Sequence, residues 1–356
     1  MKTGILADTL FMNHCAAGYH PEQPSRLSVI YKELETLGLF EKCHQVKARE
    51  ATDEEILKVH THKYLEKLKT LLPGNRGHLD PDTFFSPGSW KASLSAAGGT
   101  TDLVKMILEG SLDNGGAFVR PPGHHATPDR AMGFCILNNI AIAAESALEA
   151  GAERVAIVDW DLHHGNGTQD AFYETPDVLY ISTHMYPFYP GTGHFSETGK
   201  GKGEGYNINI PMPPRSGTEE FEEAFLRIIL PVLDQFKPSL ILVSCGFDAH
   251  VSDPIGSLRL ETSDFRRLNR LIMKKAATLC NNRMALVLEG GYDLRSIGSV
   301  SAALILDLLT GDNLQMHDPD GLIPEFFGEK TLSKRKSLIS PVVDDLSRIL
   351  SKTWAL

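Results

Sequence analysis

The sequence has little cysteine and no long uninterrupted apolar segment. Its 356 residues include five cysteines, none in a CxxC pair: Cys15, Cys43, Cys135, Cys245 and Cys280. An odd number without paired spacing argues against a disulfide framework and favours a reducing compartment, so we expect a cytoplasmic protein. No apolar run is long enough to span a membrane, and the start, MKTGILADTL, lacks the apolar core of a signal peptide.

Positive charge is also scarce. Lysine and arginine number 35 against 45 aspartates and glutamates, and the formal net charge is −10. Nucleic-acid binding relies on basic patches, so this balance argues against a direct nucleic-acid partner. It is compatible with a cationic substrate. With 42% hydrophobic and 22% charged residues, the composition is that of a globular protein.

Several catalytic signatures are missing. The sequence has no G-x-S-x-G elbow of a serine hydrolase, and no dinucleotide fingerprint follows the first apolar run. The glycine-rich stretch GKGKGEG at 199–205 lacks the GK[ST] that leads into a helix in phosphate-binding loops, so it indicates a flexible turn.

Short apolar runs rich in β-branched residues recur along the chain and predict strands. They lie at 4–8, 115–120, 154–159, 177–182, 206–210, 240–245 and 284–289. Helix-like stretches such as 218–236 separate several of them. Continuous apolar strands alternating with helices predict an α/β fold, with a mostly parallel sheet covered by helices on both faces.

No linker, repeat or low-complexity tract divides the chain, so we expect one large α/β domain over 1–356 with a core at about 14–310. The tail after Thr310 is looser, with DPDG at 318–321. The terminal amphipathic stretch VVDDLSRILSKTWAL is expected to pack back on the core as a helix.

Four polar clusters follow predicted strands directly. RPPGHH follows the run ending at Val119, and DWDLHHGNG the run ending at Val158. GFDAHVSDP follows the run ending at Cys245, and EGGYD the run ending at Leu288. Because the carboxyl ends of parallel strands share one edge, where open α/β sheets build their sites, the sequence predicts a site there.

The segment DWDLHHGNG suggests a metal site. Asp161 and His163 are two residues apart in an extended segment, so both side chains face the same side. A carboxylate and an imidazole on one target suggest a transition metal, zinc above all, with Asp253 as third ligand and an open position for water. An isolated DxH pair is also compatible with a simple hydrogen bond. The additional clusters on the same edge favour the metal.

The adjacent His124 and His125 can flank a reacting centre. If Asp159 pairs with one and Asn166 with the other, the two imidazoles differ in charge and can take different proton-transfer roles. Tyr292, after two glycines, could donate a hydrogen bond to a developing oxyanion. The alternatives are a surface turn for the histidines and a strand-capping tyrosine.

Together these motifs resemble the zinc-dependent histone deacetylase superfamily, closest to its class II and bacterial amidohydrolase branch. The matches extend over about residues 14–310 and are RPPGHHA, GFCILNNIAIAA, VAIVDWDLHHGNGTQDAFY, YPGTG, GFDAHVSDPIGS, EGGYDL and HPEQPSR. The resemblance implies an arginase-like, three-layer α/β sandwich with a central eight-stranded parallel sheet.

The resemblance also implies roles for individual residues. The zinc ligands would be Asp161, His163 and Asp253. The catalytic groups would be His124 backed by Asp159, His125 backed by Asn166, and the transition-state Tyr292. The substrate contacts would be Gly133, Phe134, Tyr189 on the opposite tunnel wall, Gly291, the gatekeeper Leu260, and the rim residue Asp82, with Thr83 as its alternative. Arg26 matches an arginine of an inner channel.

Potassium binding is implied at two further places. The first site matches Asp159, Asp161, His163, Ser182 and Thr183, and the second, mainly backbone site matches Phe172, Thr175, Val178 and Tyr206.

The implied reaction is hydrolysis of N-acyl amines, most of all acetyl-lysine side chains of peptides or proteins. An acetylpolyamine amidohydrolase and a non-catalytic acetyl-lysine binding protein are the alternatives. An arginase-like ureohydrolase would need more carboxylates for two manganese ions. An apolar gatekeeper at Leu260 predicts a preference for acetyl-lysine over acetylpolyamines, because a charged amine is costly to desolvate against leucine. Assembly into a homo-oligomer is compatible with the sequence, and no membrane partner is expected.

Overall fold

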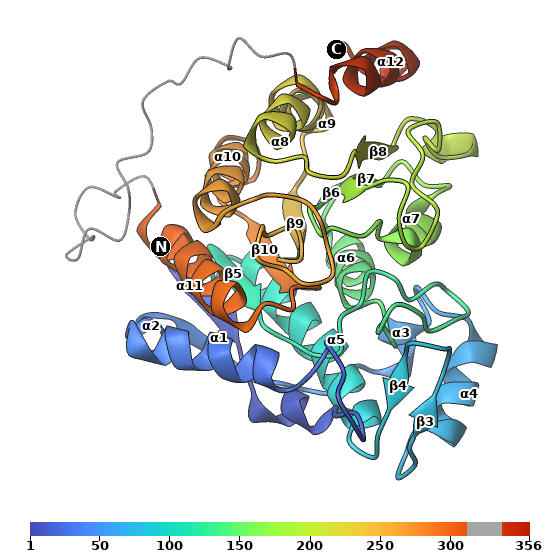
Figure 1. The fold of residues 1–356 in the computed structure, drawn as a ribbon, viewed down its shortest axis with the longest axis vertical. Helices are drawn as coiled ribbons and strands as arrows, with labels where there is room; N and C mark the ends of the chain where they lie inside the picture. Colours follow the sequence, from blue (N-terminus) through green and yellow to red (C-terminus); the bar gives the residue numbers. More distant parts are fainter. Residues whose placement is uncertain (312–336) are drawn as a thin grey trace.

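The computed structural model describes residues 1–311 and 337–356, and it is built on one large sheet (Figure 1). The sheet has eight strands in the order β2-β1-β5-β10-β9-β6-β7-β8, and every neighbouring pair is parallel. The strands are β1 (Thr3–Leu6), β2 (His44–Val46), β5 (Asn114–Ala117), β6 (Val155–Asp159), β7 (Val178–Met185), β8 (Asn207–Met212), β9 (Leu240–Cys245) and β10 (Met284–Leu288). The predicted parallel α/β sheet is confirmed.

The edge strand β2 is the one member of this sheet that the apolar pattern did not predict. It reads His-Gln-Val, and only Val46 is buried. A short strand at a sheet edge needs little apolar surface, so it leaves no hydrophobic run in the sequence. The two short strands β3 (Gly77–His78) and β4 (Phe84–Phe85) form a separate antiparallel pair.

Helices surround the sheet (Figure 1). One contacting group consists of α1 (Ser25–Thr36), α10 (Thr262–Cys280) and α11 (Leu294–Thr310), and another of α5 (Ser89–Leu108) and α6 (Asn139–Glu149). The shorter helices are η1 (Thr9–Asn13), α2 (Leu39–Lys42), α3 (Asp53–Ile56), α4 (His62–Leu71), α7 (Asn166–Phe172) and η2 (Gly201–Gly203).

The helix predicted over 218–236 forms, with a wide turn in its middle. It consists of α8 (Thr218–Ala224), a π-helical turn η3 (Phe225–Ile229) and α9 (Leu230–Phe236). Pro231 has no backbone N–H to donate to the carbonyl of Arg227, so a regular α-helix would be interrupted there. The π-helical turn accommodates the proline without ending the helix.

The terminal helix α12 (Ser340–Leu350) contacts α8 and β8. Val343 and Leu346 are buried in this contact region. Beyond the helix, the Trp354 ring lies 5.3 Å from the Tyr206 ring, and its Nε1 donates to the Gly205 carbonyl at 2.8 Å. The predicted loose DPDG at 318–321 lies outside the described residues.

The cysteines and the long helices relate to the expectations of a reducing compartment and of no membrane span. All five cysteines are free thiols, and four of them are buried. Over residues 1–311 and 337–356, no helix combines the length and apolarity that crossing a membrane requires.

Candidate active site

The four polar clusters meet because their strands are neighbours. The strands β5, β10, β9 and β6 lie side by side in the sheet and run in the same direction, so the loops after them emerge at one edge. Hydrogen bonds join these loops: the Gly290 amide donates to Asp161 at 2.8 Å, and the Leu162 amide donates to Asp248 at 2.8 Å. The predicted convergence of the clusters is therefore present.

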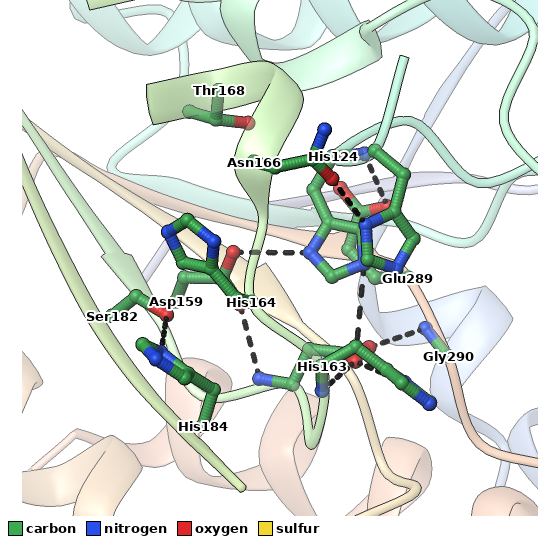
Figure 2. Close-up of polar contacts among 12 residues, drawn as sticks. His124, Asp159, His163, His164, Asn166, Thr168, Ser182, His184, Glu289 and Gly290 are labelled. Carbon is green, nitrogen blue, oxygen red and sulfur yellow. Dashed lines mark hydrogen bonds and ion pairs between the residues drawn. The ribbon is translucent and has the colours of Figure 1, made fainter. Parts of the chain in front are cut away.

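The tandem histidines His124 and His125 are buried and have different partners, and Figure 2 shows the contact of His124 with Asp159. His124 Nδ1 lies 3.1 Å from Asp159 Oδ2, and His125 Nδ1 lies 2.9 Å from Asn166 Oδ1. Asp159 also accepts a hydrogen bond from the Tyr180 hydroxyl at 3.0 Å. The structure brings both predicted pairs together. Tyr180 was not predicted, because nothing in an apolar strand marks its hydroxyl as part of a site.

The different surroundings of the two histidines shift their pKa values in opposite directions. Burial alone would lower the pKa of His124, but the carboxylates of Asp161 and Asp159 raise it to about 10. Burial, together with the neighbouring His124 and His163, lowers the pKa of His125 well below its ordinary value. The ring centroids are 4.1 Å apart. One imidazole is therefore suited to stay charged and the other to accept a proton at neutral pH.

Three buried side chains offer ligand atoms to a common point. Atoms of Asp161, His163 and Asp248 all lie within 4.8 Å of one another. His163 Nδ1 is 3.2 Å from Asp161 Oδ1 and 3.0 Å from Asp248 Oδ2. Carboxylate and imidazole donors fit zinc. Asp248 was not singled out from the sequence, although its place in GFDAH, directly after a buried strand, was a usable signal.

Asp253, the predicted third ligand, is not a member of that group. Its Oδ2 accepts the Tyr292 amide at 2.6 Å and its Oδ1 accepts the Ile255 amide at 3.0 Å. It is buried, and its charge acts on Asp248. Its role as a ligand therefore stays a prediction, with Asp248 as the competing carboxylate.

Tyr292 is buried beside the guanidinium of Arg26, which lies 5.0 Å from the centre of its ring. Arg26 holds the preceding loop as well: its Nε donates to the Gly291 carbonyl at 2.7 Å and its Nη2 to the Glu289 carbonyl at 2.5 Å. Burial raises the pKa of the Tyr292 hydroxyl well above its ordinary value, against the opposing charge of Arg26. The hydroxyl therefore stays protonated and can donate a hydrogen bond.

Glu289 is a third residue, after Tyr180 and Asp248, that was not predicted from the sequence. It is fully buried, and its Oε2 accepts the amides of Gly123 at 2.7 Å and His124 at 3.1 Å. Burial raises its pKa to about 7. These bonds tie the loop of the tandem histidines to the end of β10. A charged residue at the end of a buried strand was the signal for it.

The expected tunnel walls lie against His125. Gly133 has φ +56°, and a Cβ there would be 2.4 Å from His125 Cδ2, so glycine is required. The Tyr189 ring is 5.2 Å from the His125 ring and nearly perpendicular to it. Phe134 donates its amide to Thr83 Oγ1 at 3.0 Å, and Thr83 donates to Asp82 at 3.2 Å. Thr83 is buried and Asp82 is half-buried, so Asp82 is the more accessible rim candidate.

The expected gatekeeper position of Leu260 is wrong. Its side chain is fully buried within the hydrophobic core, and it forms a short parallel bridge with His250. Its amide donates to the Ala249 carbonyl at 3.1 Å. A side chain that is fully buried in the core cannot line a rim. Ile255, two residues after Asp253, is an apolar residue that is partly exposed.

The residues matched to the first potassium site are buried, whereas Thr175 and Tyr206 of the second are only partly buried. Ser182 Oγ lies 2.8 Å from His184 Nδ1, and Thr183 Oγ1 donates to the Asp159 carbonyl at 3.4 Å. The second group lies where α7 leads into β7 and beside β8. It comprises Phe172, Thr175, Val178 and Tyr206. Both potassium sites stay predictions.

Comparisons with known proteins agree with one another. Residues 20–308 match the histone deacetylase domain model. The chain is 39% identical to a probable deacetylase of Archaeoglobus fulgidus over 99% of both chains. It is 38% identical to a histone deacetylase-like amidohydrolase of Pseudomonas aeruginosa, over 85% of this chain and 80% of that one. The crystal structure of the HDA15 HD domain matches with a TM-score of 0.87 and 36% identity, covering 99% of this chain and 95% of that one.

Proposed function

Since the chain belongs to the histone deacetylase family and is thereby a deacetylase of the amidohydrolase type, we propose that it is zinc-dependent and acts mainly on acetyl-lysine side chains of peptides or proteins. The observation that carries this proposal is the pair of buried histidines with an aspartate and an asparagine partner, beside a cluster of metal-ligating side chains.

In this proposal zinc is held by Asp161, His163 and Asp253, with Asp248 supporting His163. Bound zinc would supply a Lewis acid and lower the pKa of a bound water towards ~7. A hydrogen-bonded carboxylate behind a ligating histidine orients the ring and strengthens its basicity. Asp248 lies 3.0 Å from His163 Nδ1, the same nitrogen that faces Asp161, and it is anchored by the Leu162 amide. It can support the ring where His163 binds zinc through Nε2, and otherwise it suits the position of a ligand.

The chain's own residues carry the proton steps. His125, kept neutral by burial and by an uncharged partner, takes the proton of the attacking water and later returns it to the leaving amine nitrogen. His124 stays positively charged on Asp159 and stabilises the negative charge that develops on the acyl oxygen. Tyr292 donates its hydroxyl proton in a hydrogen bond to the tetrahedral oxyanion.

The substrate amine is the open part of this proposal. Because Leu260 is buried, it no longer supports a preference for acetyl-lysine over acetylpolyamines. What supports a peptide substrate is a half-buried rim carboxylate, Asp82, linked through Thr83 to the Phe134 wall, where it can accept backbone amides. The same carboxylate can attract the charged amine of a polyamine, which keeps the acetylpolyamine alternative in place.

A turnover panel tests the proposal. Acetate release is measured for acetyl-lysine peptides, acetylspermidine, acetylputrescine and a small acetyl amide. The expected order places the peptides first in kcat/KM. A preference for acetylpolyamines would identify the alternative amidohydrolase, and binding of acetyl-lysine without acetate release would identify a non-catalytic binding protein.

Three further features belong to this proposal. The described residues, 1–311 and 337–356, belong to a single catalytic domain, which the contacts of α12 with α8 and β8 support. Potassium binds at the two residue groups described above. The protein acts in the cytoplasm, as its unpaired cysteines suggest.

A further inference from the structure

His164, the second histidine of the segment DLHHGNG, has no part in the proton steps, yet it is buried with both nitrogens paired. Its Nδ1 lies 2.8 Å from Thr192 Oγ1, and its Nε2 lies 3.1 Å from Gln169 Oε1. An amide oxygen can only accept, so the ring carries its proton on Nε2, and Nδ1 accepts the hydroxyl proton of Thr192. Both bonds therefore have a defined direction.

The Gln169 side of this link is firmly anchored. Its Oε1 also accepts the side-chain amides of Asn207 at 2.9 Å and Asn209 at 2.7 Å, both on β8. Its Nε2 donates to Glu197 at 2.8 Å. Strand β8 therefore holds Gln169 in place and, through it, the His164 ring. The ring's Nδ1 then offers Thr192 a hydrogen-bond acceptor at a fixed position.

Thr192 belongs to the loop 186–193, which forms one wall of the site. In this loop, the Phe188 ring stacks on His163 with 5.6 Å between centroids, and the Tyr189 ring meets His125 edge-on. The loop therefore packs directly against the buried imidazoles of His163 and His125. Gly193 has φ +91°, and a Cβ there would lie 2.7 Å from His164 Cγ.

We propose that His164 is a positioning residue that fastens the loop 186–193 through Thr192, so that Phe188 and Tyr189 are held against the reaction centre. This deepens the proposed function and rests on it, because a fixed aromatic wall matters by closing around the substrate stem. Releasing the wall weakens substrate binding more than it slows the chemistry, since the proton-transferring His125 keeps its own partner Asn166.

The test starts with Thr192→Val, which removes the hydroxyl at nearly constant shape. We expect KM for an acetyl-lysine peptide to rise about three- to tenfold, the factor that loss of one hydrogen bond implies, with kcat and metal content nearly unchanged. Thr192→Ser keeps the hydroxyl and should restore KM. Ser196→Ala removes a hydrogen bond to His194 in the exposed neighbouring turn and serves as the matched control.

A double-mutant cycle assigns the effect to the His164–Thr192 contact. His164→Phe keeps a ring but loses both bonds, and the double variant should be no worse than His164→Phe alone, because both changes remove the same link. Additive effects on KM would overturn the proposal, and so would an unchanged KM in Thr192→Val.

Hydrogen exchange separates this proposal from the proposed function. In the wild type, the Gly191 amide donates to the Phe188 carbonyl and the Gly193 amide to Glu197. Both amides should exchange faster in Thr192→Val. If no acetyl amine is turned over but these amides exchange faster, the proposed function fails while the fastening by His164 holds. Unchanged exchange would overturn the fastening.

Discussion

At the scale of single residues, the chemistry depends on what lies behind each of two adjacent imidazoles. His124 and His125 are equally buried and nearly touching, and their surroundings push their pKa values in opposite directions. The sequence was sufficient to predict both partners, Asp159 and Asn166. Asp248 and Glu289 carried a weaker signal, an acidic residue at the end of a buried strand, and the sequence could not show which backbone amides they accept.

The substitution Asn166→Asp tests the general-base role of His125. A carboxylate at the position of the amide favours the charged imidazole and should raise the His125 pKa. Because His125 must be neutral to take a proton, the acid limb of the kcat/KM profile should move to higher pH. The exposed Asn75→Asp adds the same charge elsewhere as the control. An acid limb that stays in place would contradict the assignment.

The substitution Tyr292→Phe tests the oxyanion donor. Phenylalanine keeps the ring contacts with Arg26 and Phe134 and loses only the hydroxyl. We expect kcat to fall about 10²–10³-fold with KM and thermal stability nearly unchanged. Steady-state kinetics and a melting curve measure this. A rise in KM alone would make Tyr292 a binding group instead.

Paired substitutions distinguish the two candidate carboxylates of the metal site. As the third ligand, Asp253 should be essential, so Asp253→Ala should lose zinc on dialysis. As the support of His163, Asp248 should matter less, so Asp248→Asn should weaken zinc affinity about 10–100-fold and still bind. Competition with a chromogenic chelator measures both affinities. The reverse pattern would make Asp248 the third ligand.

At the scale of elements, the sheet was predictable where strands are apolar and unpredictable where they are not. Buried parallel strands such as β6 and β9 bury all of their residues, and this gives continuous apolar runs. The edge strand β2 needs no such run. Leu260 was misplaced for a related reason: an apolar residue in a loop does not reveal from the sequence which way its side chain faces, and in the structure this side chain is buried in the core.

The docking of the C-terminal segment gives a prediction at this scale. The Trp354 ring packs against Tyr206 and Phe236, and its indole N–H is paired with Gly205. Trp354→Ala should lower the free energy of unfolding by about 3 kcal/mol, with kcat unchanged at temperatures where the protein is folded. Urea unfolding measures this, and Leu356→Ala, at a more exposed position, is the control. A wild-type-like midpoint would show that the segment contributes little.

At the scale of the whole molecule, one property of the fold assembles the site: four neighbouring strands run in the same direction and end in polar loops. The candidate ligands and histidines come from loops far apart in the sequence, as in the bond between Gly290 and Asp161. Parallel order was predictable from apolar runs alternating with helices. The strand order that makes β5, β10, β9 and β6 neighbours was available only from the structure or from the family resemblance.

If the loops at this edge of the sheet bind one zinc ion and use it to hydrolyse acetyl amines, acetate release depends on that ion. The most direct test of this dependence is acetate release from an acetyl-lysine peptide by protein stripped with a chelator and then titrated with zinc. We expect no release from the stripped protein and recovery that saturates at one zinc ion per chain. Full release by the metal-free protein, or no recovery on adding zinc to protein that remains folded, would contradict it.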